Sequence, residues 1–312
     1  MTLGHNHLRG YAEAIAAASL WASSGVFAVN LFRMGLPPES LALLRPLVGG
    51  LILLTAVCLR RPAVLRIDLQ GLAIIMLGGG FAVGVFQVAY QFSTDAVGVP
   101  STVAMLYVAP AIVTTASGPL LGEWPDRTRL ILLGVTLFGV WLSVFGATEV
   151  SSLFDSSGFT WGILAGVSYG AYTLFGRFAA PRYGSLPTVV YSTLGSCLFL
   201  ALVVPATTGP IVLPSSGPAW ALLFTFSLLT IAVAHFLFFD SLVYIDAGRA
   251  SIATAIEPVI AAVLATVLLS QSLSPVGWLG ITLVVSGVVG VGLTSRVQSA
   301  ATGDLAGEKP EY

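Results

Sequence analysis

The chain has 312 residues, of which 56% are apolar and only 9% are charged, and its mean hydropathy is +0.93. Soluble domains carry a charge on about a quarter of their residues, so this composition excludes a soluble globular domain. A net charge of −1 also argues against nucleic acid as a partner, because such a partner needs a basic face.

Ten apolar segments fill the sequence, each close to the roughly 20 residues that are needed to cross a bilayer. Short loops join them and leave no room for a soluble domain. We therefore predict an all-α membrane protein with ten transmembrane helices. The predicted spans are residues 10–32, 38–59, 70–94, 98–121, 129–148, 158–180, 186–206, 218–243, 247–269 and 274–295.

The basic residues indicate how these spans are oriented. If the spans alternate in direction, all of the 13 Lys and Arg residues except Arg33 and Arg45 fall in the tails or in loops on one side. Basic residues gather on the cytoplasmic side of membrane proteins. We therefore expect a multi-pass protein of the inner (plasma) membrane with both termini in the cytoplasm.

The two halves of the chain form a repeat with an offset of 148 residues, which aligns Gly10 with Gly158 and Gly139 with Gly287. Each half holds five spans, and an odd number means that the second copy crosses the membrane in the opposite sense. Inverted repeats of this kind recur in secondary transporters. The predicted divisions are a cytoplasmic tail at 1–9, a first repeat at 10–148, an external linker at 149–157, a second repeat at 158–295 and a cytoplasmic tail at 296–312.

The first repeat places polar and aromatic side chains inside its spans. Trp21 and Tyr107 lie too deep in their spans for an interfacial aromatic belt. Gln87 and Gln91 share one face of the third span, and because amides facing lipid are costly, they face protein or water. Arg45, in the second span, reaches towards the membrane surface, forms a structural ion pair or has a functional role within the membrane.

The second repeat holds Glu257, the only acidic residue near the middle of a predicted span. Its candidate roles are a proton carrier, a counter-charge for an amine substrate, and a structural contact with Arg45, with His235 or with backbone N–H groups near Pro258. His235, in the eighth span, is either a proton relay or a hydrogen-bonded core residue. Tyr169 lies as deep in its span as Trp21 does.

Two prolines, Pro110 and Pro258, occupy matched positions in the fourth and ninth spans. Each removes an intrahelical hydrogen bond and is expected to kink its helix, either as a packing feature or as a hinge. The two cysteines, Cys58 and Cys197, lie inside spans and predict no disulfide. The sequence shows no phosphate loop, dinucleotide turn or zinc-spaced Cys/His set, so we expect no cofactor, metal ion or catalytic residue.

Several motifs resemble those of the EamA-type branch of the drug/metabolite transporter superfamily, over residues 10–295. They are Ser19-Leu20-Trp21-Ala22-Ser23-Ser24, Leu43-Leu44-Arg45-Pro46, Tyr107-Val108-Ala109-Pro110, Leu120-Leu121-Gly122-Glu123 and Ala255-Ile256-Glu257-Pro258-Val259. One departure is Leu269-Ser270-Gln271, where a second Leu-Gly-Glu would be expected. The resemblance implies a cavity among spans one, three, four, six, eight and nine, with spans five and ten at the periphery.

These observations predict a secondary transporter that exports a small polar metabolite, an amino acid or a related compound, across the inner membrane by alternating access. The alternatives are a broad-specificity exporter of apolar drugs and, from a different class, an intramembrane hydrolase. We expect a small-molecule substrate, a lipid bilayer as surroundings, coupling to protons or to the substrate gradient, and a monomer or homodimer. The predicted substrate-binding residues are Trp21, Gln87, Tyr90, Gln91, Tyr107, Tyr169, Tyr172, His235 and Glu257, and the predicted hinge residues are Pro110 and Pro258.

Overall fold

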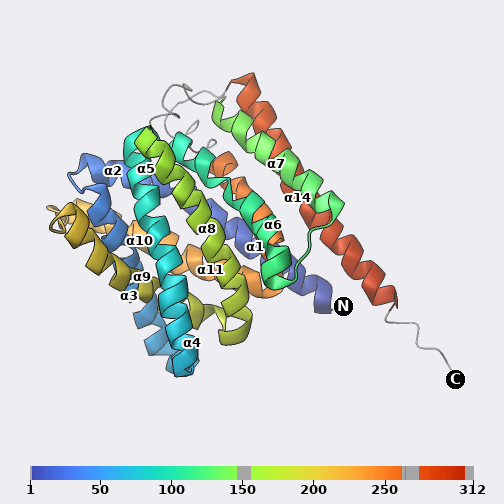
Figure 1. The fold of residues 1–312 in the computed structure, drawn as a ribbon, viewed down its shortest axis with the longest axis horizontal. Helices are drawn as coiled ribbons and strands as arrows, with labels where there is room; N and C mark the ends of the chain where they lie inside the picture. The colour runs from blue at the N-terminus through green and yellow to red at the C-terminus, as the bar shows by residue number, and fades with distance from the viewer. Residues whose placement is uncertain (1, 146–155, 262–263, 265–273, 306–312) are drawn as a thin grey trace.

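The computed structural model of the protein describes residues 2–145, 156–261, 264 and 274–305. Within these ranges the chain forms α-helices, short 3-10 and π segments, and no strand, as the composition predicts. The helices pack into one bundle (Figure 1). Most of the predicted linker at 149–157, the 269–271 motif and the last residues of the C-terminal tail lie outside the described residues.

Helices cover each of the five spans predicted in the first half. The second and fifth spans are single helices, and the others contain a break or a π segment. In chain order the elements are α1 (Thr2–Trp21), α2 (Ser24–Arg33), α3 (Pro38–Arg60), η1 (Pro62–Leu65), α4 (Leu69–Ile74), η2 (Ile75–Gly79), α5 (Gly80–Leu106), α6 (Ala109–Leu121) and α7 (Arg127–Phe145).

The second half is also helical over its five predicted spans, as far as the structure describes them. Residues 257–261 and 264 continue the ninth span after a short 3-10 turn. In chain order the elements are α8 (Ser156–Tyr183), α9 (Ser185–Thr208), α10 (Gly217–Ser227), η4 (Leu228–Val233), α11 (Ala234–Tyr244), α12 (Ala247–Ala253), η5 (Thr254–Ile256) and α14 (Pro275–Leu305).

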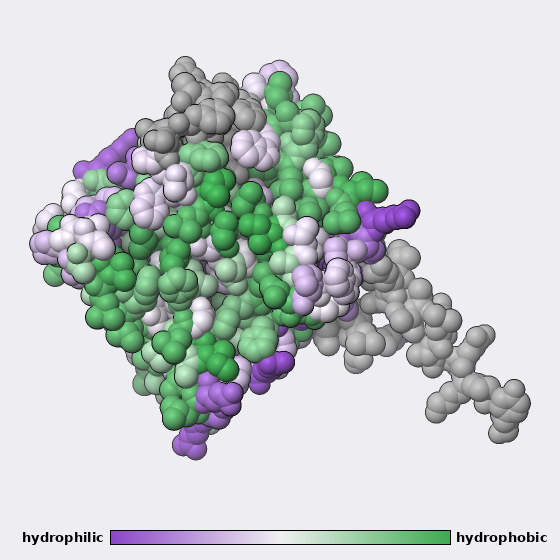
Figure 2. Space-filling model, in the orientation of Figure 1, coloured by the Kyte–Doolittle hydropathy of each residue, from purple (hydrophilic) through white to green (hydrophobic). Residues whose placement is uncertain are grey.

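The outer surface of the bundle suits a bilayer. Among the described residues, five helical segments are long and apolar enough to cross a membrane: His7–Arg33, Pro38–Arg60, Leu69–Val97, Ser185–Thr208 and Gly217–Tyr244. Large apolar side chains such as Phe81, Leu120 and Phe138 are exposed. Figure 2 shows apolar residues over the middle of one face and hydrophilic residues towards its margins, which is the pattern expected of a surface in contact with lipid.

The helix α5 contains the boundary between the third and fourth predicted spans. The hydroxyl oxygens of Ser93 and Thr102 lie 2.8 Å apart. Nine residues of straight helix would separate these two positions by about 13.5 Å, so the chain must reverse direction between them. The two spans therefore turn back on each other between Ser93 and Thr102, an interval that contains the loop predicted at 95–97.

In the fourth and ninth spans, which hold the matched prolines Pro110 and Pro258, the helix is broken shortly before the proline. The fourth span breaks at Tyr107 and Val108, and Pro110 is the second residue of the following helix α6. The ninth span narrows into η5, and Pro258 is the second residue of the helical stretch that begins at residue 257. Proline has no N–H to donate and is tolerated in the first turn of a helix. The expected kinks are thus helix breaks at matched positions.

Some packing contacts between the two halves occur twice, the second time with the roles of the halves exchanged. Helix α1 packs on α11 of the second half, and α8 packs on α5 of the first. A Cβ atom on Gly10 would lie 3.0 Å from Ile245 Cγ2, and one on Gly158 would lie 2.3 Å from Val97 Cγ1. Val97 and Ile245 are separated by the same offset as the two glycines, so one close contact occurs twice.

Two further pairs join equivalent helices of the two halves. Helix α3 packs on α9, and α7 packs on α14 along one side of the bundle (Figure 1). Gly139 lies against the backbone of Gly280, and its repeat mate Gly287 lies against Thr136. The fifth and tenth spans therefore form a peripheral pair, and the remaining helices enclose the centre of the bundle, as expected for two inverted five-helix repeats.

Candidate functional site

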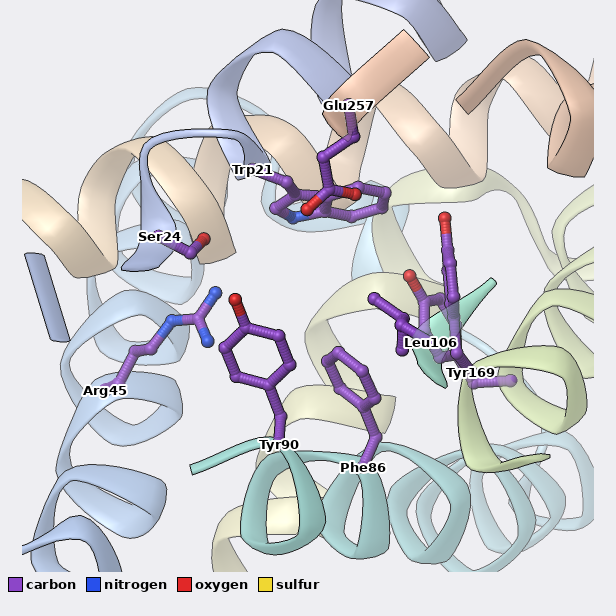
Figure 3. Close-up of a pocket in the computed structure, with 9 residues that line it drawn as sticks. Trp21, Ser24, Arg45, Phe86, Tyr90, Leu106, Tyr169 and Glu257 are labelled. Carbon is purple, nitrogen blue, oxygen red and sulfur yellow. The ribbon is translucent and has the colours of Figure 1, made fainter. Parts of the chain in front are cut away.

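A small closed cavity lies at the centre of the bundle, where helices of both halves meet (Figure 3). Its volume of about 20 Å³ has room for about one water molecule. In this structure the cavity is therefore too small to hold a metabolite. The lining residues are Trp21, Ser24, Arg45, Phe86, Tyr90, Leu106, Tyr169, Tyr172 and Glu257.

Arg45 brings a buried positive charge to this cavity from α3. Its side chain is only 2% exposed. Its Nε donates a hydrogen bond to Thr230 Oγ1 at 3.1 Å, and its Nη1 donates to Gln87 Oε1 at 3.3 Å. The guanidinium carbon lies 4.4 Å from the centroid of the Phe226 ring, which adds a cation–π contact. All of these partners are neutral, and the carboxylate of Glu257 attracts the guanidinium only from beyond ion-pair distance.

The π segment η4 supplies a backbone carbonyl to the wall of the site. In a π turn the usual i to i+4 hydrogen bonding is interrupted, and the Thr230 carbonyl accepts from side chains instead. Trp21 Nε1 donates to it at 2.9 Å. His235 Nδ1 lies 2.7 Å from the same oxygen, and because a carbonyl only accepts, Nδ1 carries the proton. These bonds hold the Trp21 indole between η4 and the cavity.

Glu257 brings a carboxylate to the cavity from the start of the helical stretch that follows η5. It is 4% exposed, and its polar neighbour is the Tyr107 hydroxyl. Among the described residues no cationic group lies within ion-pair distance of it. The 3-10 turn before it is held by tyrosines, since Tyr169 donates to Thr254 Oγ1 at 3.1 Å and Tyr107 donates to the Thr254 carbonyl at 3.4 Å.

Aromatic rings form much of the remaining wall. The Trp21 and Tyr169 rings meet edge to face at 6.0 Å, and Tyr169 packs against Tyr172 at 5.1 Å and Phe86 at 5.9 Å, measured between centroids. Phe86 in turn lies 5.7 Å from Tyr90. Such a wall can hold an apolar part of a ligand, while the hydroxyl groups and the two charges hold its polar part.

The predicted site residues divide into two groups. Five of them line the cavity: Trp21, Tyr90, Tyr169, Tyr172 and Glu257. The other four are buried behind it: Gln87, Gln91, Tyr107 and His235. Among the hydrogen bonds of the described residues, both polar atoms of the Gln91 amide, Gln87 Nε2 and His235 Nε2 have no partner. These buried atoms retain the capacity to bind a polar group.

Four lining residues were not among the predicted ones, and Arg45 corrects an interpretation. It neither reaches the membrane surface nor forms an ion pair with a described carboxylate, because neutral groups from α5 and η4 surround it. Ser24 could have been found from the repeat, since it aligns with Tyr172. Phe86 and Leu106 carry no signal that distinguishes them from ordinary core residues.

The arrangement of spans around the cavity also differs from the one that the resemblance implied. The second span contributes Arg45, whereas the eighth span contributes no lining residue. The reason lies in the Trp21 side chain, which packs on His235 at 5.3 Å and on Phe238 at 5.2 Å. The indole therefore covers the eighth span on the side that would otherwise face the cavity.

A network of ion pairs closes one end of the bundle, where the connection between α11 and α12 lies. Arg177 of α8 pairs with Glu123 after α6 and also donates to the Leu242 carbonyl at 2.6 Å. Glu123 Oε2 accepts from the Ala247 N–H at 3.1 Å. Arg129 of α7 pairs with Asp246 at 2.9 Å. We call Glu123, Arg129, Arg177, Asp246 and Arg249 the end network; Arg249 pairs with Asp246 at 3.3 Å.

A second cluster of charges lies close to this network. Arg9 Nη2 pairs with Asp240 Oδ2 and Arg9 Nε with Glu13 Oε1, both at 2.7 Å. The Ser185 hydroxyl donates to Asp240. The cluster joins the beginning of α1 to the end of α11 and to the beginning of α9, so the end of the bundle that holds the beginning of α1 is closed by two sets of polar contacts.

Comparisons with known proteins agree with this architecture. The model of the EamA-like transporter family matches residues 8–145 and 156–293. The "Uncharacterized inner membrane transporter YicL" of Salmonella typhimurium is 25% identical over 300 residues, which cover 94% of this chain and 98% of that relative. The "Uncharacterized transporter YwfM" of Bacillus subtilis is 24% identical over 288 residues, which cover 92% and 95% respectively. A crystal structure with 18% sequence identity shares the fold, with a TM-score of 0.75 over 93% of this chain and 98% of that one.

Proposed function

Because this chain belongs to the EamA-like transporter family, whose model matches both of its halves, we propose that it exports a small polar metabolite, an amino acid or a related compound, across the inner membrane by alternating access. The protein is a multi-pass membrane transporter and not an enzyme. The intramembrane hydrolase considered from the sequence is therefore excluded.

The observation that carries this proposal is the charged cavity between the two repeats. Arg45 and Glu257 are both almost completely buried and both line it. Ionisable residues within a membrane protein are costly and usually mark a substrate or ion pathway. A cavity that carries both charges suits a polar solute better than an apolar one.

Alternating access requires that the cavity open to one side at a time. At about 20 Å³ the cavity is too small for a metabolite, so a substrate can enter only after the helices move apart. The end network is the natural barrier on one side, since it joins α6, α7, α8 and α12. The helix breaks before Pro110 and Pro258 offer pivots between that barrier and the cavity.

The proposed export is tested with purified protein in proteoliposomes. A carrier should take up a radiolabelled solute with saturation and should be stimulated by the same unlabelled solute inside the vesicles. A channel would show neither property. Metabolite profiles of medium from cells that overproduce the protein and from cells that lack it should identify the solute. Unchanged profiles together with no saturable uptake would refute the proposal.

A second candidate is a broad-specificity exporter of apolar drugs. The observation in its favour is the aromatic wall formed by Trp21, Phe86, Tyr169 and Tyr172. Such an exporter should expel a neutral lipophilic dye such as Nile red from cells, and the substitution of Glu257 by Gln should affect this export little. Polar metabolites should then not compete with the dye.

The proposed direction of transport depends on orientation, which cysteine labelling can test. We expect both termini, and with them the end network, on the cytoplasmic side. In a chain whose Cys58 and Cys197 are replaced by Ala, a cysteine at the exposed Ser216 should react with an impermeant thiol reagent added outside the cell. A cysteine at the exposed Thr128 should not react. The reverse pattern would invert the proposed topology.

A further inference from the structure

Two opposite charges face the cavity from different repeats without contacting each other. Arg45 comes from α3 of the first half, and Glu257 comes from the ninth span in the second half. Figure 3 shows both side chains directed into the same space, with the Tyr90 hydroxyl beside the guanidinium. Among the described residues neither has an ion-pair partner within 4.0 Å.

This arrangement differs from a buried structural ion pair. A buried charge is stable only if an opposite charge and further hydrogen bonds satisfy it. Here Arg45 is 2% exposed and Glu257 is 4% exposed, yet the two side chains leave a gap that the cavity occupies. A solute with one negative and one positive group would satisfy both at once.

The guanidinium of Arg45 is prepared for such a contact. Its Nε and Nη1 donate to Thr230 and Gln87, and its flat face rests on the Phe226 ring. The hydrogen bonds of the described residues leave Nη2 without an acceptor. Because the planar guanidinium group is already held in place, it loses little conformational entropy when it binds a carboxylate.

We propose that Arg45 binds the carboxylate and Glu257 binds the ammonium group of one zwitterionic substrate, so that the transporter accepts molecules that carry both charges and rejects those that carry one. This inference rests on the proposed export of a small polar metabolite and names its chemical class. The aromatic wall then takes up the remainder of the substrate. Each repeat supplies one of the two charges, so a bound substrate contacts both repeats.

The first test uses the unaltered protein in proteoliposomes. The probe is a radiolabelled mixture of the protein amino acids, and the retained species are identified by chromatography. For each transported amino acid, the N-acetyl derivative lacks the ammonium group and the amide derivative lacks the carboxylate. We expect each derivative to compete at least about 30-fold more weakly than its parent, the factor typical for a buried charge left unpaired.

The second test assigns each end of the substrate to one residue. In the Glu257→Gln variant the preference for the parent over its N-acetyl derivative should shrink towards onefold, while the preference over the amide persists. In the Arg45→Gln variant the pattern should be reversed. Matched controls are Glu39→Gln and Arg33→Gln, which make the same changes outside the cavity and should leave both preferences intact.

The outcomes separate this inference from the proposed function. Equal competition by the parent and both derivatives would overturn the inference, as would saturable transport of polar metabolites that excludes zwitterions, and in both cases the export proposal would stand. The absence of saturable uptake for any metabolite would instead refute the export proposal. Because the derivative panel needs no substitution, the inference remains testable if a variant does not reach the membrane.

Discussion

The end network contains partly exposed charges that pair with each other, whereas the central cavity contains two buried charges that do not pair. In the end network, Asp246 alone contacts Arg129, Arg177 and Arg249, at 2.9, 3.8 and 3.3 Å. In the cavity, Arg45 has only neutral partners, and Glu257 has the Tyr107 hydroxyl as its neighbour. The charges of the network pair with each other, although Arg129 Nη1 has no hydrogen-bond partner among the described residues, whereas the two charges of the cavity form no ion pair.

This difference indicates what each region does. Charges that pair with each other hold helices together and form a barrier, because separating them exposes unpaired ions. Charges that face a cavity without pairing are available to a ligand. The two regions are joined by α6, which lies between the cavity residue Leu106 and Glu123 in the sequence, and by α12 and η5, which lie between Asp246 and Glu257. A change at either region can therefore be passed to the other.

The largest effect is expected from Glu257→Gln, which removes the cavity carboxylate and keeps its shape. Transport should fall at least about 30-fold, because a charged partner of the substrate is lost. Thermal stability in detergent should stay the same or rise, because an unpaired buried charge has been removed. The measurements are initial rates in proteoliposomes and the midpoint of thermal unfolding.

The pH dependence of the same variant separates the two roles of Glu257. If this carboxylate carries the coupled proton, exchange should persist and the pH dependence of net transport should disappear. If it binds the ammonium group, affinity should fall at every pH. A parental rate with an unchanged pH profile would make Glu257 a structural residue and would turn attention to His235.

A smaller loss of transport is expected from Gln87→Glu, which gives Arg45 a paired carboxylate like those in the end network. The new carboxylate would lie where Gln87 Oε1 now accepts from Arg45 Nη1 at 3.3 Å, and would form an ion pair with the guanidinium. Transport should fall about tenfold, since a pairing worth roughly 1.4 kcal/mol must be broken by the substrate. The control is Gln87→Leu, which removes the acceptor without adding a charge and should be less harmful. Equal loss in both variants would show that occupation of Arg45 is not the cause.

The fold could be predicted from the sequence more completely than the arrangement of the cavity. The ten spans and their boundaries follow from hydropathy, and even the turn hidden within α5 falls in an interval that contains the predicted loop. The inverted relation follows from the repeat, because Gly10 and Gly158 mark the same packing contact twice. These features depend on residues that are close in sequence or related by one offset.

The environment of Arg45 could not be predicted in the same way. Its partners come from α5 and from η4, about forty and nearly two hundred residues further along the chain. The π segment that presents Thr230 has no compositional signature. A single arginine in an apolar span was therefore open to two structural interpretations and a functional one, and the structure supports neither structural interpretation.

A still smaller effect is expected from Glu123→Gln, the matched substitution in the end network. Arg177 would lose its closest carboxylate but keep the Leu242 carbonyl and Asp246. For a partly exposed pair the unfolding free energy should fall by about 1 kcal/mol, and transport should stay within about threefold of the parental rate. The control is Glu13→Gln, whose pair with the exposed Arg9 should matter less. A loss of transport as large as that of Glu257→Gln would contradict the distinction between the two regions.

The smallest effect is expected at the helix breaks that separate the cavity from the end network. Replacing Pro110 or Pro258 by Ala restores a backbone N–H and permits a continuous helix across the break. The two regions would then move as one rigid piece, so turnover should slow by less than about twofold while the amount of protein in the membrane changes less. The control is Pro119→Ala, which alters an exposed proline within the same helix α6 away from the break. If all three variants transport equally well, the breaks serve packing alone, and the coupling between network and cavity must run through another contact, of which Arg177 to the Leu242 carbonyl is the strongest candidate.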